Sequence, residues 1–195
     1  MYKSNLLDIL GIYHKTDKAT KDNGSWIPHN YTIVYHDYFY SLKESVNKVL
    51  EIGVSSSLRM WRDYFSNAQI FGIDINPEMF VEERITTWPG NVASRDDLTS
   101  FIQQFGSDYD IIIDDGDHVE ESQCISLGFL FPHVKPNGYY IVEDLTNGLF
   151  ENLKNEKIHA SMLDSEETYL KNNIKYSTTI RTGLYDSLLG IIIKS

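Results

Sequence analysis

The sequence predicts a doubly wound α/β fold, with a mostly parallel seven-stranded sheet covered by helices on both faces. Two observations carry this prediction. Between residues 48 and 143, five short apolar runs alternate with stretches of helical periodicity, and such alternation is typical of parallel strands joined by helices. Near the C-terminus, two more strand-like runs follow with only a short connection around Gly183, which indicates an antiparallel pair.

Each apolar run is bounded by residues that end a strand. Asn76 and Pro77 follow the second run, Pro89 and Gly90 the third, and a Pro-Asn-Gly turn at 136–138 precedes the fifth, because proline and glycine interrupt regular structure. We expect strands at Lys48–Val54, Gln69–Ile75, Arg84–Trp88, Tyr109–Asp114, Tyr139–Glu143, Lys175–Arg181 and Leu188–Lys194.

The segments between the strands have helical spacing. Leu58, Trp61 and Phe65 lie on one face of a helix that Ser57 can cap. Further helices are expected at Asp96–Phe105 and Val119–Val134, and a stripe from Tyr31 to Leu42 predicts one near the N-terminus. At 195 residues the chain is expected to be a single domain, with a helical cap segment at 1–46 and the sheet core at 47–195.

Composition restricts the function. A formal net charge of −11 disfavours nucleic acid and anionic membranes as partners, because both require clustered cationic side chains. Cys124 is the single cysteine, so no disulfide forms within the chain. No apolar run approaches the length of a membrane span. We therefore expect a cytoplasmic protein.

Acidic residues follow nearly every predicted strand. They are Glu51, Asp74, the pair Asp114 and Asp115, and the pair Glu143 and Asp144. Taken singly, each of these acids can instead cap the next helix. Because the carboxyl ends of parallel strands meet at one edge of a sheet, where ligands bind, the whole set predicts a charged site at that edge.

The first strand-to-helix loop indicates the kind of cofactor. A carboxylate at Asp74 is placed to accept the two hydroxyls of a ribose. The loop of sequence GVSSS, from Gly53 to Ser57, lacks the further glycines that a pyrophosphate requires. A cofactor with a ribose but no phosphate, such as S-adenosylmethionine, therefore fits better, and its cationic groups suit an acidic site.

A second group of residues predicts a metal site. Asp115, Glu143 and Asp144 would repel one another unless a cation lay among them, and carboxylate oxygens prefer hard cations such as Mg²⁺. His118 follows Asp115 by three residues, where an imidazole can act as general base. Capping of the following helix is the alternative role for His118.

Five motifs resemble those of a known family. They are EIG at 51–53, GIDI at 72–75, DIIIDDGDH at 110–118, PNG at 136–138 and VEDL at 142–145. In this order they resemble class I S-adenosylmethionine-dependent methyltransferases, whose core is Rossmann-like. More narrowly, they are similar to the metal-dependent sugar O-methyltransferases of macrolide tailoring and to their relatives in polysaccharide gene clusters. An upstream segment with Thr16-Asp17-Lys18, then His29-Asn30-Tyr31 and Tyr35, is similar to that family as well.

The resemblance implies a role for each matching residue. Asp115, Glu143 and Asp144 would bind the metal and His118 would be the general base. The implied cofactor-binding residues are Glu51, Gly53, Ser55, Asp74, Asn91, Val92 and Asp114. The sequence departs from the family where Asp117 stands in place of the usual Ser, and where the loop after Gly53 is short.

The expected substrate is a hydroxyl of a sugar or glycoside, with the acceptor itself left open. Segments 11–30 and 144–173 are expected to cover it as lids, and a homo-oligomer is a possible way to complete the pocket. Two other functions stay open at this point. One is a divalent-metal hydrolase that uses the same acids, and the other is a non-catalytic binding module.

Overall fold

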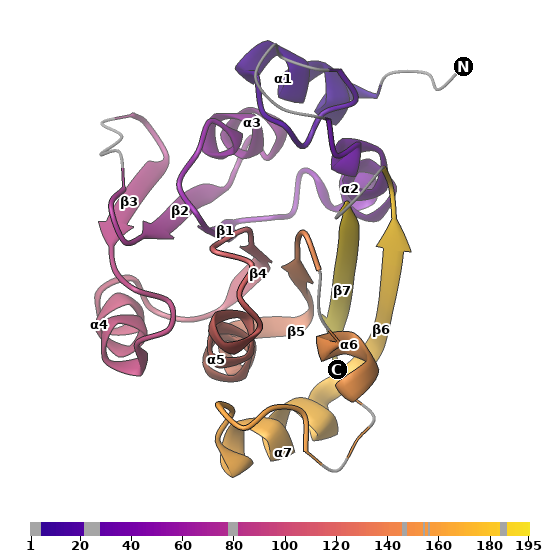
Figure 1. Ribbon diagram of the computed structural model, residues 1–195. Helices are drawn as coiled ribbons and strands as arrows, with labels where there is room; N and C mark the ends of the chain where they lie inside the picture. The colour runs from indigo at the N-terminus through magenta and orange to yellow at the C-terminus, as the bar shows by residue number, and fades with distance from the viewer. Residues whose placement is uncertain are drawn as a thin grey trace.

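The computed structural model describes residues 5–21, 28–77, 82–145, 148–153, 155, 157–183 and 187–195. Within these residues one sheet of seven strands has the order β3-β2-β1-β4-β5-β7-β6, with helices on both sides of it (Figure 1). The strands are β1 Lys48–Ile52, β2 Gln69–Asp74, β3 Ile85–Pro89, β4 Tyr109–Asp114, β5 Val134–Val142, β6 Ile174–Arg181 and β7 Leu188–Lys194.

The strand directions confirm the predicted fold class. Strands β1 to β5 are parallel to their neighbours, whereas β7 is antiparallel to both β5 and β6. The chain runs outward from β1 through β2 to β3 and then crosses back to β4 on the other side of β1. The topological switch point therefore lies between the carboxyl ends of β1 and β4. Sheets of this kind bind ligands at that point.

Helices cover each face of the sheet with a separate core. Buried side chains of α1, α2 and α3 pack on one face, and those of α4 to α7 pack on the other. The helices are α1 Leu6–His14, α2 Tyr31–Phe39, α3 Ser57–Tyr64, α4 Arg95–Phe105, α5 Glu120–Leu130, α6 Leu149–Asn152 and α7 Asp164–Asn173, with 3-10 turns η1 Tyr40–Leu42 and η2 Phe131–His133.

Strand β1 shows why the central strands are apolar throughout. Successive side chains of a strand point to opposite faces: Leu50 and Ile52 belong to the core under α4 and α5, and Val49 belongs to the core under α2 and α3. Helices thus cover both faces of the sheet at β1. A strand that alternated polar and apolar residues would bury polar side chains on one of these faces. Glu51, the one acid in β1, is fully buried and requires partners.

Several predicted element boundaries differ from those in the structure. The helix expected to reach Val134 ends at Leu130 and continues as the 3-10 turn η2, because Pro132 cannot extend an α-helix. Strand β5 begins at Val134 and contains the proline–glycine turn expected before it, with a shift in its register against β4. Helix α3 starts at Ser57 rather than being capped by it.

The segment 144–173 differs from the lid that was expected. In its described part, Leu145, Leu149, Ile158, Met162 and Leu170 are all buried in the core under α5, and α7 lies at the far end of the molecule from α1 in Figure 1. A segment with this much buried apolar surface is held in place by it. No helix in the described part of the chain is long and apolar enough to span a bilayer.

Candidate functional site

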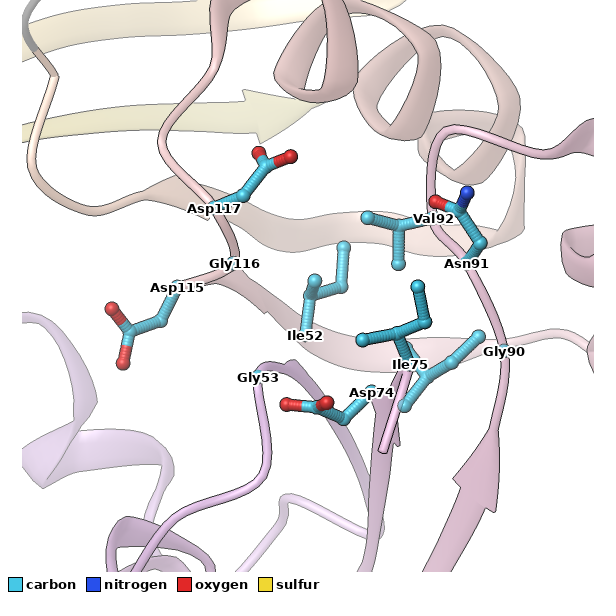
Figure 2. A pocket seen from close by; sticks show the side chains of 11 residues that line it. Ile52, Gly53, Asp74, Ile75, Gly90, Asn91, Val92, Asp115, Gly116 and Asp117 are labelled. Atoms are coloured by element: carbon cyan, nitrogen blue, oxygen red, sulfur yellow. The ribbon is translucent and has the colours of Figure 1, made fainter. Parts of the chain in front are cut away.

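A cavity of about 290 Å³ opens at the carboxyl ends of β1, β2, β3 and β4, at the topological switch point. Figure 2 shows the side chains that line it. Four of the predicted cofactor residues are among them, together with Asp115 of the predicted metal set. The lining residues are Ile52, Gly53, Ile73, Asp74, Ile75, Gly90, Asn91, Val92, Asp115, Gly116 and Asp117.

Gly53 lets the ends of β1 and β4 approach each other. Its φ angle is +88°, and a Cβ atom at this position would lie 2.2 Å from the backbone oxygen of Asp115. Both the left-handed backbone and this contact exclude other side chains. The close contact between Gly53 and the backbone of Asp115 therefore requires the glycine of the EIG motif, whatever ligand the cavity binds.

Asp74 is fixed at the polar end of the cavity. Its two carboxylate oxygens accept hydrogen bonds from the backbone N–H of Val54, at 3.1 Å, and of Asn76, at 2.9 Å. Ile75 and Val92 supply apolar surface beside it (Figure 2). This combination of an oriented carboxylate and an apolar wall suits a ligand with a ribose joined to a flat base.

Three predicted cofactor residues lie outside the cavity lining, and Glu51 is the clearest. Its carboxylate accepts hydrogen bonds from Ser57 Oγ at 2.7 Å and from Trp61 Nε1 at 3.0 Å, and Lys18 Nζ lies 3.3 Å away. Burial raises the pKa of Glu51 to about 7, although Lys18 opposes the shift. Its partners join β1 to α3 and to the N-terminal segment.

The other two such residues are also bonded within the protein. Asp114 is buried and accepts hydrogen bonds from the hydroxyls of Ser126 and Tyr140, and burial raises its pKa to about 6. The hydroxyl of Ser55 lies 2.7 Å from that of Ser57, at the start of α3. Contacts of Glu51, Ser55 and Asp114 with a cofactor stay predictions.

Next to the cavity, Asp115, His118 and Asp144 form a cluster with the geometry of a cation site. One ligand atom from each lies within 4.8 Å of the others, and His118 Nε2 is 3.7 Å from Asp144 Oδ2. The Nδ1 atom of His118 is buried without a hydrogen-bond partner among the described residues. Buried ring nitrogens usually have a hydrogen-bond partner, which makes this atom an exception among the described residues.

Asp144 is oriented by two residues of the N-terminal segment. The hydroxyl of Tyr31 donates to Asp144 Oδ1, and His29 Nδ1 lies 2.9 Å from the same oxygen. Burial by itself would raise the pKa of Asp144, but the bonds from His29 and Tyr31 hold it below its usual value. The carboxylate is therefore kept in its charged form, which a cation requires.

Glu143, the third predicted metal ligand, lies behind this cluster and outside it. Its Oε2 atom is 2.7 Å from Lys18 Nζ, and its Oε1 atom accepts a hydrogen bond of 2.5 Å from the Tyr35 hydroxyl. Lys18 Nζ also lies 2.5 Å from Asp115 Oδ2. The structure thus brings two of the three predicted carboxylates together and pairs the third with a lysine.

Reasoning from residue types alone missed the residues that hold these acids. Lys18, His29, Tyr31 and Tyr35 lie far from the acids in the sequence, and only their place in a segment similar to the family pointed to them. Asp117, noted for its unusual charge, accepts hydrogen bonds from the backbone N–H of Val119 and the hydroxyl of Ser122. It therefore ties the loop before α5 to the first turn of that helix.

The chain is similar in sequence to known enzymes, although no protein-family model matches it. It is 39% identical over 127 residues to demethylmacrocin O-methyltransferase of Streptomyces fradiae, a match to 60% of this chain and 32% of that one. It is 36% identical over 146 residues to 8-demethyl-8-(2-methoxy-alpha-L-rhamnosyl)-tetracenomycin-C 3'-O-methyltransferase of Streptomyces olivaceus, a match to 70% of this chain and 36% of that one. The chain is a homologue of sugar O-methyltransferases. The match spans about a third of the length of these relatives.

A solved structure agrees with the sequence matches. The MycE methyltransferase from the mycinamycin biosynthetic pathway, in complex with Mg and SAH, has a TM-score of 0.74 and 25% sequence identity, and the match covers 99% of this chain and 55% of that one. The predicted resemblance to sugar O-methyltransferases and the predicted Rossmann-like methyltransferase fold are both confirmed.

Proposed function

We propose that the protein transfers a methyl group from S-adenosylmethionine to a hydroxyl of a sugar or a glycosylated acceptor, with the help of a divalent cation such as Mg²⁺. One observation carries the proposal. Asp115 both lines the cavity and belongs to the cluster with His118 and Asp144. A methyl donor and an acceptor hydroxyl can therefore meet at a single residue.

The cavity fits a phosphate-free cofactor. Its described lining contains three carboxylates, from Asp74, Asp115 and Asp117, and neither lysine nor arginine. A phosphate would be repelled there, whereas the sulfonium and ammonium groups of S-adenosylmethionine would be attracted. Asp74 would bind the ribose, and Asn91 and Val92 would contact the adenine, as the resemblance implies.

The cluster fits a divalent cation. Asp115 and Asp144 offer carboxylate oxygens of the type that Mg²⁺ prefers, and one ring nitrogen of His118 lies in the same cluster. When bound, the cation would lower the pKa of the acceptor hydroxyl. Glu143 would join the ligands, as the resemblance implies, only if it exchanged its bonds to Lys18 and Tyr35.

The residues of the chain would then act in sequence. His118 would take the proton of the acceptor hydroxyl as general base, and Asp144, 3.7 Å from its Nε2 atom, would stabilise the imidazolium that forms. The acceptor oxygen would attack the methyl carbon and the thioether would leave, which gives a methyl ether and S-adenosylhomocysteine. Most of the rate would come from alignment of donor and acceptor.

Two alternatives and two further expectations stay open to test. A divalent-metal hydrolase would use the same acids but would not need Asp74, and a non-catalytic binding module would act through a partner. The curated relatives named above are methyltransferases. A homo-oligomer that completes the pocket is a prediction for light scattering. The cytoplasmic location likewise stays a prediction.

The first experiment is calorimetry with S-adenosylmethionine and S-adenosylhomocysteine, followed by a screen for transfer of labelled methyl to sugars and glycosides. We expect both cofactors to bind and a subset of glycosides to be methylated. EDTA should abolish the transfer, and Mg²⁺ should restore it. Absence of cofactor binding would leave the hydrolase or the binding module, and full activity in EDTA would remove the metal from the proposal.

A further inference from the structure

Lys18 is a fully buried lysine surrounded by acids. Its residue exposure is 1%, and its Nζ atom lies 2.5 Å from Asp115 Oδ2, 2.7 Å from Glu143 Oε2 and 3.3 Å from Glu51 Oε1. These acids come from β1 and from the carboxyl ends of β4 and β5. A buried lysine is costly unless it is paired, so its place among three acids calls for an explanation.

The fold holds Lys18 in this position from both sides. Asp8 in α1 is buried and accepts hydrogen bonds from the backbone N–H and the hydroxyl of Thr20, at 2.9 and 2.8 Å, and from the Thr32 hydroxyl at 2.8 Å. The backbone oxygen of Lys18 accepts a hydrogen bond of 3.0 Å from the N–H of Thr32. The segment is thus tied to α1 and α2, and the ammonium cannot swing into solvent.

Lys18 contacts both an acid that faces the protein interior, Glu143, and an acid of the proposed metal site, Asp115. Glu143 has both oxygens engaged, one by Lys18 and one by Tyr35, so it faces inward. Asp115 is shared, because one oxygen meets Lys18 and the residue also belongs to the cluster with His118 and Asp144. A fixed positive charge therefore lies directly behind one of the proposed metal ligands.

We propose that Lys18 is a positioning residue that acts as a built-in cation of the site. It orients Asp115, forms an ion pair with Glu143 that a metal would have to displace, and lowers the affinity of the site for a divalent cation. The inference rests on the proposed function, because it concerns the same metal site. Its physical basis is that a fixed unit charge repels a divalent ion nearby, and that cation affinity rises with the number of free carboxylate ligands.

The test is Mn²⁺ binding to the folded protein with S-adenosylhomocysteine present, followed by the paramagnetic signal of free Mn²⁺. We expect Lys18→Met to bind Mn²⁺ at least about tenfold more tightly than the natural protein, while methyl transfer falls. A lysine that only supported the fold would have the opposite effect, because its loss would loosen the acids and weaken binding. Unchanged or weaker Mn²⁺ binding in a folded Lys18→Met protein would overturn the inference.

Lys194→Met is the matched control. Lys194 is also buried, but its Nζ atom donates to the backbone oxygens of Pro132 and Val134, each at 2.7 Å, and none of its bonded partners among the described residues is an acid. We expect its removal to lower stability and to leave Mn²⁺ affinity unchanged. A comparable tightening in this control would show that loss of a buried lysine, rather than the position of Lys18, changes the affinity.

Lys18→Met can also be made in a Glu51→Gln protein, in case the single variant does not fold. In Glu51→Gln, one acid beside Lys18 is neutral, so removal of the lysine leaves fewer unpaired charges. Lys18→Met should again tighten Mn²⁺ binding there, and failure to do so would also overturn the inference. If the natural protein binds no Mn²⁺, the metal in the proposed function fails. Binding gained on Lys18→Met would then still support the inference, and its absence would overturn it.

Discussion

The two halves of the site are built in different ways. In the half beside β2 and β3, Asp74 is held by backbone N–H groups that lie 20 and 2 residues away in the sequence. In the half beside β4 and β5, Asp115 and Glu143 pair with Lys18 across 97 and 125 residues, and Asp144 bonds Tyr31 across 113. Asp74 is thus held by loops near it in the sequence, whereas the acid cluster depends on a distant segment.

This difference separates what each half tolerates. The cavity is open to solvent and requires correct turns at the strand ends, which glycine and capping residues provide. The cluster is partly buried, and its acids are paired with residues of the N-terminal segment. Changes in the cavity should therefore alter ligand affinity alone, and changes in the cluster should alter chemistry or stability.

The largest effect is expected at His118. His118→Ala should lower turnover by about 10²- to 10⁴-fold, because a positioned general base contributes that much, and should leave binding of S-adenosylhomocysteine unchanged. Rate assays and calorimetry measure the two quantities. His133→Ala, whose ring bonds Ser107 at the opposite end of β4, is the control. Near-normal turnover of His118→Ala would contradict the assignment of His118 as the general base.

A smaller effect is expected at Asp74, in the other half. Asp74→Ala should weaken S-adenosylhomocysteine binding by about tenfold or more, because it removes a charged hydrogen-bond acceptor worth about 1.5–3 kcal/mol. Mn²⁺ binding should not change. Asp96→Ala, which removes an exposed acid from α4, controls for lost charge. Equal losses of cofactor and Mn²⁺ affinity at Asp74 would contradict the separation of the two halves.

Asp114 tests a buried acid that has no lysine beside it. Burial raises its pKa to about 6, above the value in the unfolded chain of about 3.9. The folded state therefore binds the proton more tightly, and this group stabilises the fold increasingly as pH falls from about 6 to 4. Relative to Asp114→Asn, the free energy of unfolding of the natural protein should rise by about 1–3 kcal/mol over that range.

Urea unfolding in EDTA at pH 7, 6, 5 and 4 measures this difference without bound metal. Tyr140→Phe is the control, because it removes one hydrogen bond of 3.3 Å to Asp114 and keeps the carboxyl group. Its stability should stay pH-dependent in the same direction as that of the natural protein. A stability difference between the natural protein and Asp114→Asn that is constant with pH would contradict the raised pKa.

The smallest effect is expected at Ser55. Its side chain is exposed and bonds Ser57 at the start of α3, so Ser55→Ala should change S-adenosylhomocysteine affinity by less than about threefold, as surface substitutions usually do. Ser57→Ala should instead lower stability, because Ser57 donates to buried Glu51. A large loss of cofactor affinity at Ser55 would place the serine loop in the binding site after all.

The sequence predicted the local features of the site well. Strand β4 has the predicted bounds, Tyr109–Asp114, and the acids do follow the strands at the switch point. Gly53, Asp74, Asn91 and Val92 line the cavity, because each lies at the end of a strand or within three residues of it, and the apolar runs indicate where those strands are. The errors at the end of α5 and the start of β5 arose where the chain continues through proline and glycine with altered geometry.

The partners of the buried acids were beyond prediction from residue types. Glu51, predicted to contact the cofactor, also bonds α3 and lies beside Lys18. Glu143, predicted to bind the metal, also bonds Lys18 and Tyr35. Adjacent acids at a strand end also point to different faces, so Asp114 turns into the core while Asp115 lines the cavity.

The sequence alone determined the sheet, the edge at which ligands bind, and the acidic character of that edge, because apolar periodicity, turn residues and strand-end charges act over short stretches of chain. Only the tertiary structure decided which acids face the cavity and which are neutralised. That choice depends on the packing of an N-terminal segment that carries Lys18 and Tyr31 against strands about a hundred residues away, and no local pattern encodes such a contact.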